Sequence, residues 1–72
     1  MKNKYIVEYI EKDGLISIGI YKTYRAIAKA TDEDYTDVRT IHLMCTGVIK
    51  KKFLHPRLKK LKTIMKINNL KI

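Results

Sequence analysis

Apolar and polar positions at the start of the chain follow the pattern of a β-hairpin. The run from Tyr5 to Ile10 is rich in β-branched and aromatic residues, which favour strands. Asp13-Gly14 comes next, and this pair signals a hairpin because a tight turn needs a positive φ angle. Every second residue of the return strand is an isoleucine, at Ile16, Ile18 and Ile20. We therefore predict a hairpin over residues 4–21 whose isoleucines share one face and lie on the core. Gly19 predicts a bulge or a close approach in this strand.

Helix-end signals follow the hairpin. Thr23 and Asp34 are suitable N-caps for two helices, over residues 24–30 and about 35–45, because their side-chain oxygens can accept from unpaired amides of the first turn. Gly47 can end the second helix in the left-handed conformation. The pattern therefore predicts two short helices joined by a tight turn.

The last third of the chain is less clearly patterned. Residues 48–54 (VIKKKFL) fit either a third short strand or an extended loop. Pro56 is favourable at the first position of a helix, and helical spacing of leucines continues over residues 57–66. Asn68-Asn69 is expected to end this helix, which leaves a frayed tail over residues 70–72.

These elements predict an α+β fold in one small domain, residues 1–72. It divides into a β-hairpin (4–21), a pair of helices (23–46), and a basic strand or loop followed by a basic C-terminal helix (48–67). A chain of this length buries only about 60% of its unfolded surface, so its core is small.

Charge is strongly partitioned along the chain. All seven acids lie between Glu8 and Asp37, whereas ten of the sixteen basic residues lie after Asp37. The formal net charge of +9 is therefore almost wholly a property of the C-terminal half. Such a one-signed field repels itself, and nucleic acid is a common polyanion that supplies the counter-charge. An AT-rich genome would also enrich lysine, but it would not remove the acids.

The two predicted helices carry a recognisable spacing. Ala28 in the first is followed by Val38 ten residues later and by Ile41 three further on. This pattern of a small residue, a turn and two buried positions resembles the helix-turn-helix family. The segment YRAIAKATDEDYTDVRTI is similar to small phage- and virus-encoded helix-turn-helix modules, over residues 16–43. The family usually has glycine in the turn, where this chain has Asp32.

The resemblance implies that outward side chains of the second helix face the major groove. These are Tyr35, Thr36, Arg39, Thr40 and Leu43. Arg39 is the candidate for reading guanine because its planar guanidinium matches two acceptors on that base, and its alternative role is an ion pair with Glu33, Asp34 or Asp37. The residues expected to contact phosphate are Lys50, Lys51, Lys52, Arg57, Lys59, Lys60 and Lys62.

We therefore expect a nucleic-acid-binding protein, with DNA favoured over RNA, that acts as a phage- or virus-type transcription regulator or a nucleoid-associated protein. Two alternatives stay open: a small phage-type inhibitor that binds an acidic host protein as an anti-defence protein, and an RNA-binding module. A homodimer is compatible with the small core, through either the C-terminal helix or the outer hairpin edge.

Other functional classes have little support in the sequence. No catalytic arrangement or Gly-rich phosphate loop is legible, so we expect neither an enzyme nor a cofactor. A lone Cys45 with His42 and His55 does not make a metal-ligand set. No apolar run approaches the ~20 residues that cross a bilayer, and no signal peptide is evident, which favours an intracellular location, cytoplasmic or nucleoid-associated.

Overall fold

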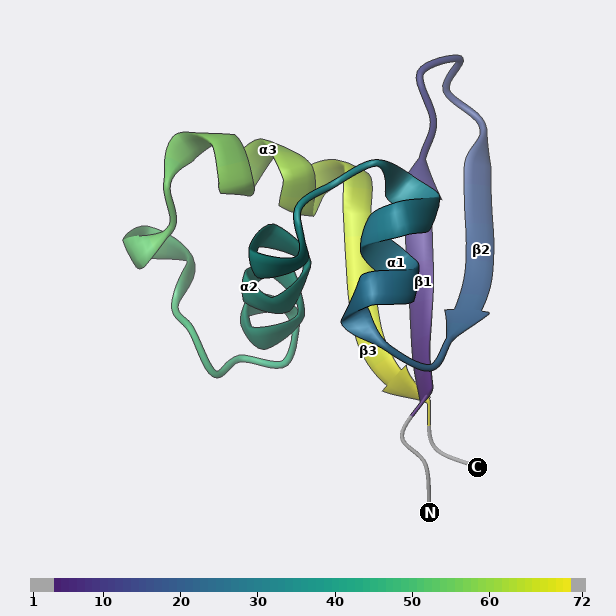
Figure 1. Cartoon of the computed structure of the whole chain (residues 1–72). Helices are drawn as coiled ribbons and strands as arrows, with labels where there is room; N and C mark the ends of the chain where they lie inside the picture. Colours follow the sequence, from purple (N-terminus) through teal and green to yellow (C-terminus); the bar gives the residue numbers. More distant parts are fainter. Residues whose placement is uncertain (1–3, 71–72) are drawn as a thin grey trace.

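Three antiparallel strands and three α-helices form the described part of the chain, residues 4–70, in a computed structural model. In chain order they are β1 (Lys4–Ile10), β2 (Ile16–Tyr21), α1 (Tyr24–Thr31), α2 (Tyr35–Cys45), the 3-10 helix η1 (Lys51–Phe53), α3 (Pro56–Ile64) and β3 (Met65–Leu70). Helices α1 and α2 lie against one face of the sheet, and α3 crosses near one end of it (Figure 1). The α+β class predicted from the sequence is confirmed.

The predicted hairpin is present, with a connection of five residues. β1 and β2 pair antiparallel up to Ile10, which lies opposite Ile16. The amide of Glu11 donates to the carbonyl of Leu15 at 2.8 Å, and Gly14 has a φ angle of +86°. Glycine adopts that left-handed conformation without steric cost, so the Asp-Gly pair located the turn correctly.

The isoleucines of β2 point to solvent, so the prediction that they lie on the core was wrong. Ile16, Ile18 and Ile20 are 65%, 65% and 58% exposed. The core side of the hairpin is set by β1, where Val7 is buried and the tyrosines on either side of it, Tyr5 and Tyr9, pack against the core. Because Val7 lies opposite Gly19, the alternation of β2 sends its isoleucines to the other face.

Gly19 accommodates an aromatic ring on the core side of β2. A Cβ atom at this position would lie 2.7 Å from Oη of Tyr21 and 2.8 Å from its Cε2. Those separations are shorter than van der Waals contact, so any side chain here would displace the ring. The predicted close approach is therefore made by Tyr21, two residues further along the same strand.

The end of the described chain is a strand, and the predicted helix end with a frayed tail was wrong. α3 stops at Ile64, and β3 pairs antiparallel with β1, which gives the strand order β2-β1-β3. Met65 and Ile67 are 1% and 0% exposed, whereas Lys66 and Asn68 between and after them are exposed. This period of two is the strand pattern. Residues 71–72 of the expected tail lie outside the described residues.

The segment between α2 and α3 contains no strand within its described residues, so the loop was the correct option for residues 48–54. Its amides close short turns, as where Phe53 and Leu54 donate to Lys50 and Lys51 at 3.0 and 3.1 Å. Leu54 is buried, at 6% exposure, and holds the loop to the protein. The third strand of the fold lies instead at residues 65–70.

The helix ends follow most of the predicted signals. Thr23 caps α1, since its Oγ1 accepts from the amide of Ala26 at 3.1 Å. Asp34 occupies the N-cap position of α2 but makes no side-chain capping bond there. Gly47 follows the end of α2 with a φ angle of +85°.

The core is one cluster that joins both helices to the sheet. Its fully buried members come from every layer: Val7, Ile27, Val38, Ile41, Met65 and Ile67. The strand tyrosines and Cys45 are partly buried and pack against it from the side. Two of the six are residues of β3, so that strand is integral to the hydrophobic interior.

The alternation in β3 predicts opposite effects for neighbouring substitutions. Ile67→Ala is expected to lower the free energy of unfolding by about 2–5 kcal/mol, because it opens a cavity at a fully buried site. Asn68→Ala, on the solvent side, is expected to change it by less than about 0.5 kcal/mol. Urea denaturation measures both. Similar losses at the two positions would contradict the strand assignment.

Candidate nucleic-acid interface

Helix α2 has one buried and one exposed side. Val38 and Ile41 are completely buried, while Tyr35, at 47% exposure, Thr36 and Arg39 are open to solvent. The other two predicted base-reading residues are less available. Thr40 and Leu43 are half-buried, and the hydroxyl of Thr40 donates to the carbonyl of Thr36 at 2.9 Å.

The turn between α1 and α2 consists of residues 32–34. Asp32 has φ 56° and ψ 41°, the left-handed conformation, and its amide donates to the carbonyl of Ala28. Glu33 donates to the same carbonyl at 3.0 Å. Asp and Asn enter this conformation more readily than most non-glycine residues, so the chain reverses here without glycine.

Arg57, expected to contact phosphate, is instead paired with an acid. Its Nη1 lies 2.8 Å from Oδ2 of Asp37, whose side chain is 11% exposed. Among the described residues that buried oxygen has no hydrogen-bond partner of good geometry, so Arg57 acts as its counter-charge. The pKa of Arg57 is raised above its ordinary value, first by the direct contact with the Asp37 carboxylate and second by the negative charge of that carboxylate. An ion pair with Asp37 was one of the alternative roles considered for Arg39, and the structure pairs Asp37 with Arg57.

More acids surround the start of α2. Burial, followed by the charge of Asp37, raises the pKa of Glu33 above its ordinary value. Asp32 and Asp34 are exposed on either side of it. A phosphate approaching this end of α2 would be repelled, whereas Arg39 lies more than one helical turn further along.

The predicted phosphate-binding lysines lie in two places. Lys50, Lys51 and Lys52 are exposed on the loop that contains η1, at the end of the molecule opposite β2 (Figure 1). Of the α3 lysines, Lys60 is exposed and Lys59 and Lys62 are half-buried. α3 packs against α2, so both groups belong to segments that follow or flank α2.

An exposed aromatic ring accompanies the loop lysines. Phe53 is 72% exposed, and Nζ of Lys52 lies 5.1 Å from the centre of its ring. Val48, at the start of the loop, is 69% exposed. The ring of Phe53 therefore lies in solvent and takes no part in the core.

Sequence reasoning missed a buried polar contact that orients α2. The hydroxyl of Tyr24 and Nδ1 of His42 are 2.6 Å apart and share a hydrogen bond. The ring of Tyr5 stacks on Tyr24 at 5.0 Å and meets His42 edge-on at 4.9 Å. β1, α1 and α2 are thereby joined through three aromatic side chains. Only the placement of His42 on the inner side of α2 could be read from helical spacing.

Burial controls the ionisation of this cluster. It lowers the pKa of His42, whose Nε2 is buried without a hydrogen-bond partner in the described part of the chain, although Asn69 opposes the shift. Burial also raises the pKa of Tyr24, and the neighbouring Tyr5 adds to that effect. Both side chains are therefore held in their neutral forms near neutral pH.

Two other kinds of site are not found among residues 4–70. No group of three His, Cys, Asp or Glu side chains lies close enough to hold a metal ion. None of the described helices combines the length and apolar character needed to cross a bilayer.

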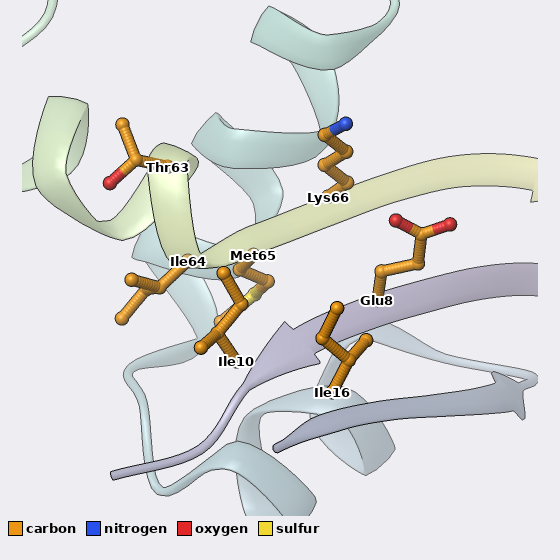
Figure 2. Close-up of a pocket in the computed structure, with 7 residues that line it drawn as sticks. All are labelled: Glu8, Ile10, Ile16, Thr63, Ile64, Met65 and Lys66. Carbon is orange, nitrogen blue, oxygen red and sulfur yellow. The ribbon is translucent and has the colours of Figure 1, made fainter. Parts of the chain in front are cut away.

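A hollow of about 180 Å³ opens on the outer face of the sheet, lined by Glu8, Ile10, Ile16, Thr63, Ile64, Met65 and Lys66 (Figure 2).

Comparison with protein-family models, with curated proteins and with solved structures yielded no match. The functional interpretation therefore depends on this chain's own residues and geometry.

The buried His42 predicts a loss of stability in mild acid. Because its pKa in the folded protein is below the ordinary value of 6.5, the unfolded chain takes up a proton first as the pH falls. The free energy of unfolding is constant above pH 6.5 for this group and decreases below it, by up to about 1.4 kcal/mol per pH unit. Urea denaturation between about pH 7.5 and 5.5 measures the slope.

The second histidine of the chain provides the control. His55 is exposed and caps α3 through Nδ1, which accepts from the amide of Arg57 at 3.2 Å. His42→Gln is expected to flatten the slope below pH 6.5, whereas His55→Asn, which keeps a capping acceptor, should retain the part of the slope that His42 contributes. An unchanged slope in His42→Gln would contradict the assignment, whatever its overall stability.

Proposed function

We propose that this protein binds duplex DNA, with α2 against the major groove and with lysines of the η1 loop and α3 on phosphates. The observation that carries the proposal is the exposed side of α2, which presents Arg39, Thr36 and Tyr35, in a chain whose positive charge lies mostly in the segments that follow α2. A helix of that width fits the major groove, and arginine is the side chain that most often reads guanine there.

The geometry of the α1–α2 pair supports a helix-turn-helix interpretation. Three residues connect the helices, and Ala28, the small residue of the pattern, packs against the core. Val38 and Ile41, the two positions expected to be buried, are completely buried. Asp32 adopts the left-handed conformation at the place where the family usually has glycine. The departure in sequence is thus compatible with the same local backbone.

Arg57 has a different role in this proposal from the one that the sequence suggested. Its pairing with Asp37 offsets one carboxylate in the first turn of α2, where uncompensated acids would oppose the approach of phosphate. The pair also holds the start of α3 beside α2. We therefore remove Arg57 from the direct phosphate contacts and retain Lys50, Lys51, Lys52, Lys59, Lys60 and Lys62.

A second candidate function has its own supporting observation. The exposed ring of Phe53 among three lysines is the combination with which proteins bind single strands, by stacking on an unpaired base. Competition of single-stranded DNA and double-stranded RNA against duplex DNA distinguishes single-strand binding and RNA binding from the binding of duplex DNA proposed above.

A small inhibitor that binds an acidic host protein stays an alternative. Capture of a host protein from nuclease-treated lysate would favour that function.

The loop lysines are expected to set the salt dependence of binding. Replacing Lys50, Lys51 and Lys52 with alanine should weaken binding to every duplex and reduce the slope of log K against log salt by about 2.7, at ~0.9 per phosphate contact. Fluorescence anisotropy titration over a salt series measures this. Failure of the unmodified protein to bind duplex at low salt would refute the proposal.

A matched variant controls for net charge. Lys12, Lys22 and Lys29 are exposed on the hairpin, the following turn and α1, and replacing them with alanine removes the same three charges. This triple variant should keep the salt slope of the unmodified protein. Equal losses in the two triple variants would show attraction by overall charge, without a defined phosphate-binding surface.

Arg39 is expected to determine sequence preference. A preferred site is first selected from a randomised duplex pool, and binding is then compared with a duplex in which the contacted guanine is replaced. Arg39→Ala should lose about 1–3 kcal/mol of this discrimination. Arg39→Lys should retain general affinity but lose most discrimination, because lysine lacks the planar two-donor fork. A preference that both variants retain would contradict base reading by Arg39.

A further inference from the structure

The outer face of the sheet is a large apolar surface that no described element of the chain covers. Its side chains on β1 and β2, here called the isoleucine face, are Ile6, Ile10, Ile16, Ile18 and Ile20. They form cross-strand pairs, with Ile6 opposite Ile20 and Ile10 opposite Ile16. All except the half-buried Ile6 are exposed. Contiguous apolar patches of this kind mark interaction surfaces.

The strand at this edge also lacks the usual protection. Edge strands of isolated sheets usually carry charges, prolines or bulges that prevent pairing with another chain. β2 has the sequence ISIGIY, with no charged residue and no proline, in a chain of which 32% of residues are charged. β2 therefore carries no charge that would oppose contact of the adjacent apolar face with another chain.

Charge indicates which partner covers it. The hairpin over residues 4–21 holds two lysines and three acids, so its net charge is about −1, against +9 for the chain. The cationic η1 loop lies at the opposite end of the molecule (Figure 1). Two copies that meet through the isoleucine face therefore keep these loops apart. β2 offers no cation to nucleic acid, and on the neighbouring strands Glu8 lies opposite Lys66, so a strongly charged partner finds no row of opposite charges on this face.

The face is also complementary to itself. Glu8, at its centre opposite Ile18, lies beside Lys66 of β3, and the two side chains project to the same side of the sheet (Figure 2). A two-fold axis through this face can bring the acid of each copy towards the base of the other. The hollow beside Ile10 and Ile64, of about 180 Å³, can receive an aliphatic side chain from the partner.

We infer that the isoleucine face packs against the same face of a second copy, so that two sheets stack face to face in a two-fold dimer. The helices lie on the far side of each sheet and stay free. Strands of six or seven residues, ~4.8 Å apart, give a contact smaller than the ~800 Å² per partner of a standard interface. We therefore expect a dimer that dissociates in the micromolar range.

Sedimentation velocity over a micromolar concentration series, without nucleic acid, tests the inference independently of DNA binding. The unmodified protein should shift from monomer to dimer as concentration rises. Ile18→Lys and Ile18→Glu should each raise the dissociation constant by at least about tenfold, because both place a charge at the centre of the apolar contact. The two substitutions change the net charge in opposite directions. Weaker dimerisation in both variants therefore cannot come from net charge and is due to disruption of the apolar contact.

Val48→Lys is the matched control, because Val48 is 69% exposed on the loop at the other end of the molecule. It should dimerise like the unmodified protein, and circular dichroism should show that all variants are folded. A protein that stays monomeric throughout the series overturns the inference. So does dimerisation that both Ile18 variants retain, or a monomer that binds uncharged lipid vesicles through Ile18.

Discussion

The pairing of β3 with β1 is the contact on which the rest of the structure depends. It brings Leu70 opposite Lys4, close to the two ends of the chain, and makes β1 the central strand. A two-stranded hairpin is at best marginally stable, and a third strand with one covered face is what normally stabilises it. Met65 and Ile67 also supply one third of the fully buried core. In a chain that buries only about 60% of its unfolded surface, little else could replace that contribution.

The position of α2 follows from this sheet and from two polar contacts. Val38 and Ile41 hold its inner side on the core, while the hydrogen bond between Tyr24 and His42 sets its position relative to α1. At the other side, the ion pair of Asp37 and Arg57 links it to α3. These contacts lie on different sides of the helix and limit its rotation. The exposure of Arg39 is therefore a consequence of packing.

Local signals in the sequence predicted the elements that local chemistry decides. Asp13-Gly14, Thr23 and Gly47 each located a turn or helix end, since backbone conformation there depends on one or two residues. The face of β2 could not be read in this way. Alternation gives a period of two but does not say which set of residues meets the helices, and that choice depends on pairing with Val7.

β3 and the role of Arg57 were hidden for a related reason. The alternation over residues 65–68 is short and directly follows a helical pattern, and its partner strand lies about sixty residues earlier in the chain. Likewise, nothing near Arg57 in the sequence indicates that Asp37, twenty residues before it, is its partner. Of the candidate site, the buried side of α2 could therefore be predicted, but which cations are free for a ligand could not.

The two proposals together constrain how the protein would engage DNA. Stacking two sheets by their outer faces leaves the helical layers on opposite outsides of the dimer, because α1 and α2 cover the inner face of each sheet (Figure 1). The two α2 helices would then point away from each other. Dimeric helix-turn-helix proteins that read adjacent half-sites need both recognition helices on one side, about 34 Å apart. A dimer through the isoleucine face cannot place both α2 helices on one side of the molecule. It would instead hold two separate duplex segments, a geometry that favours a nucleoid-associated role over a repressor that reads a palindromic site.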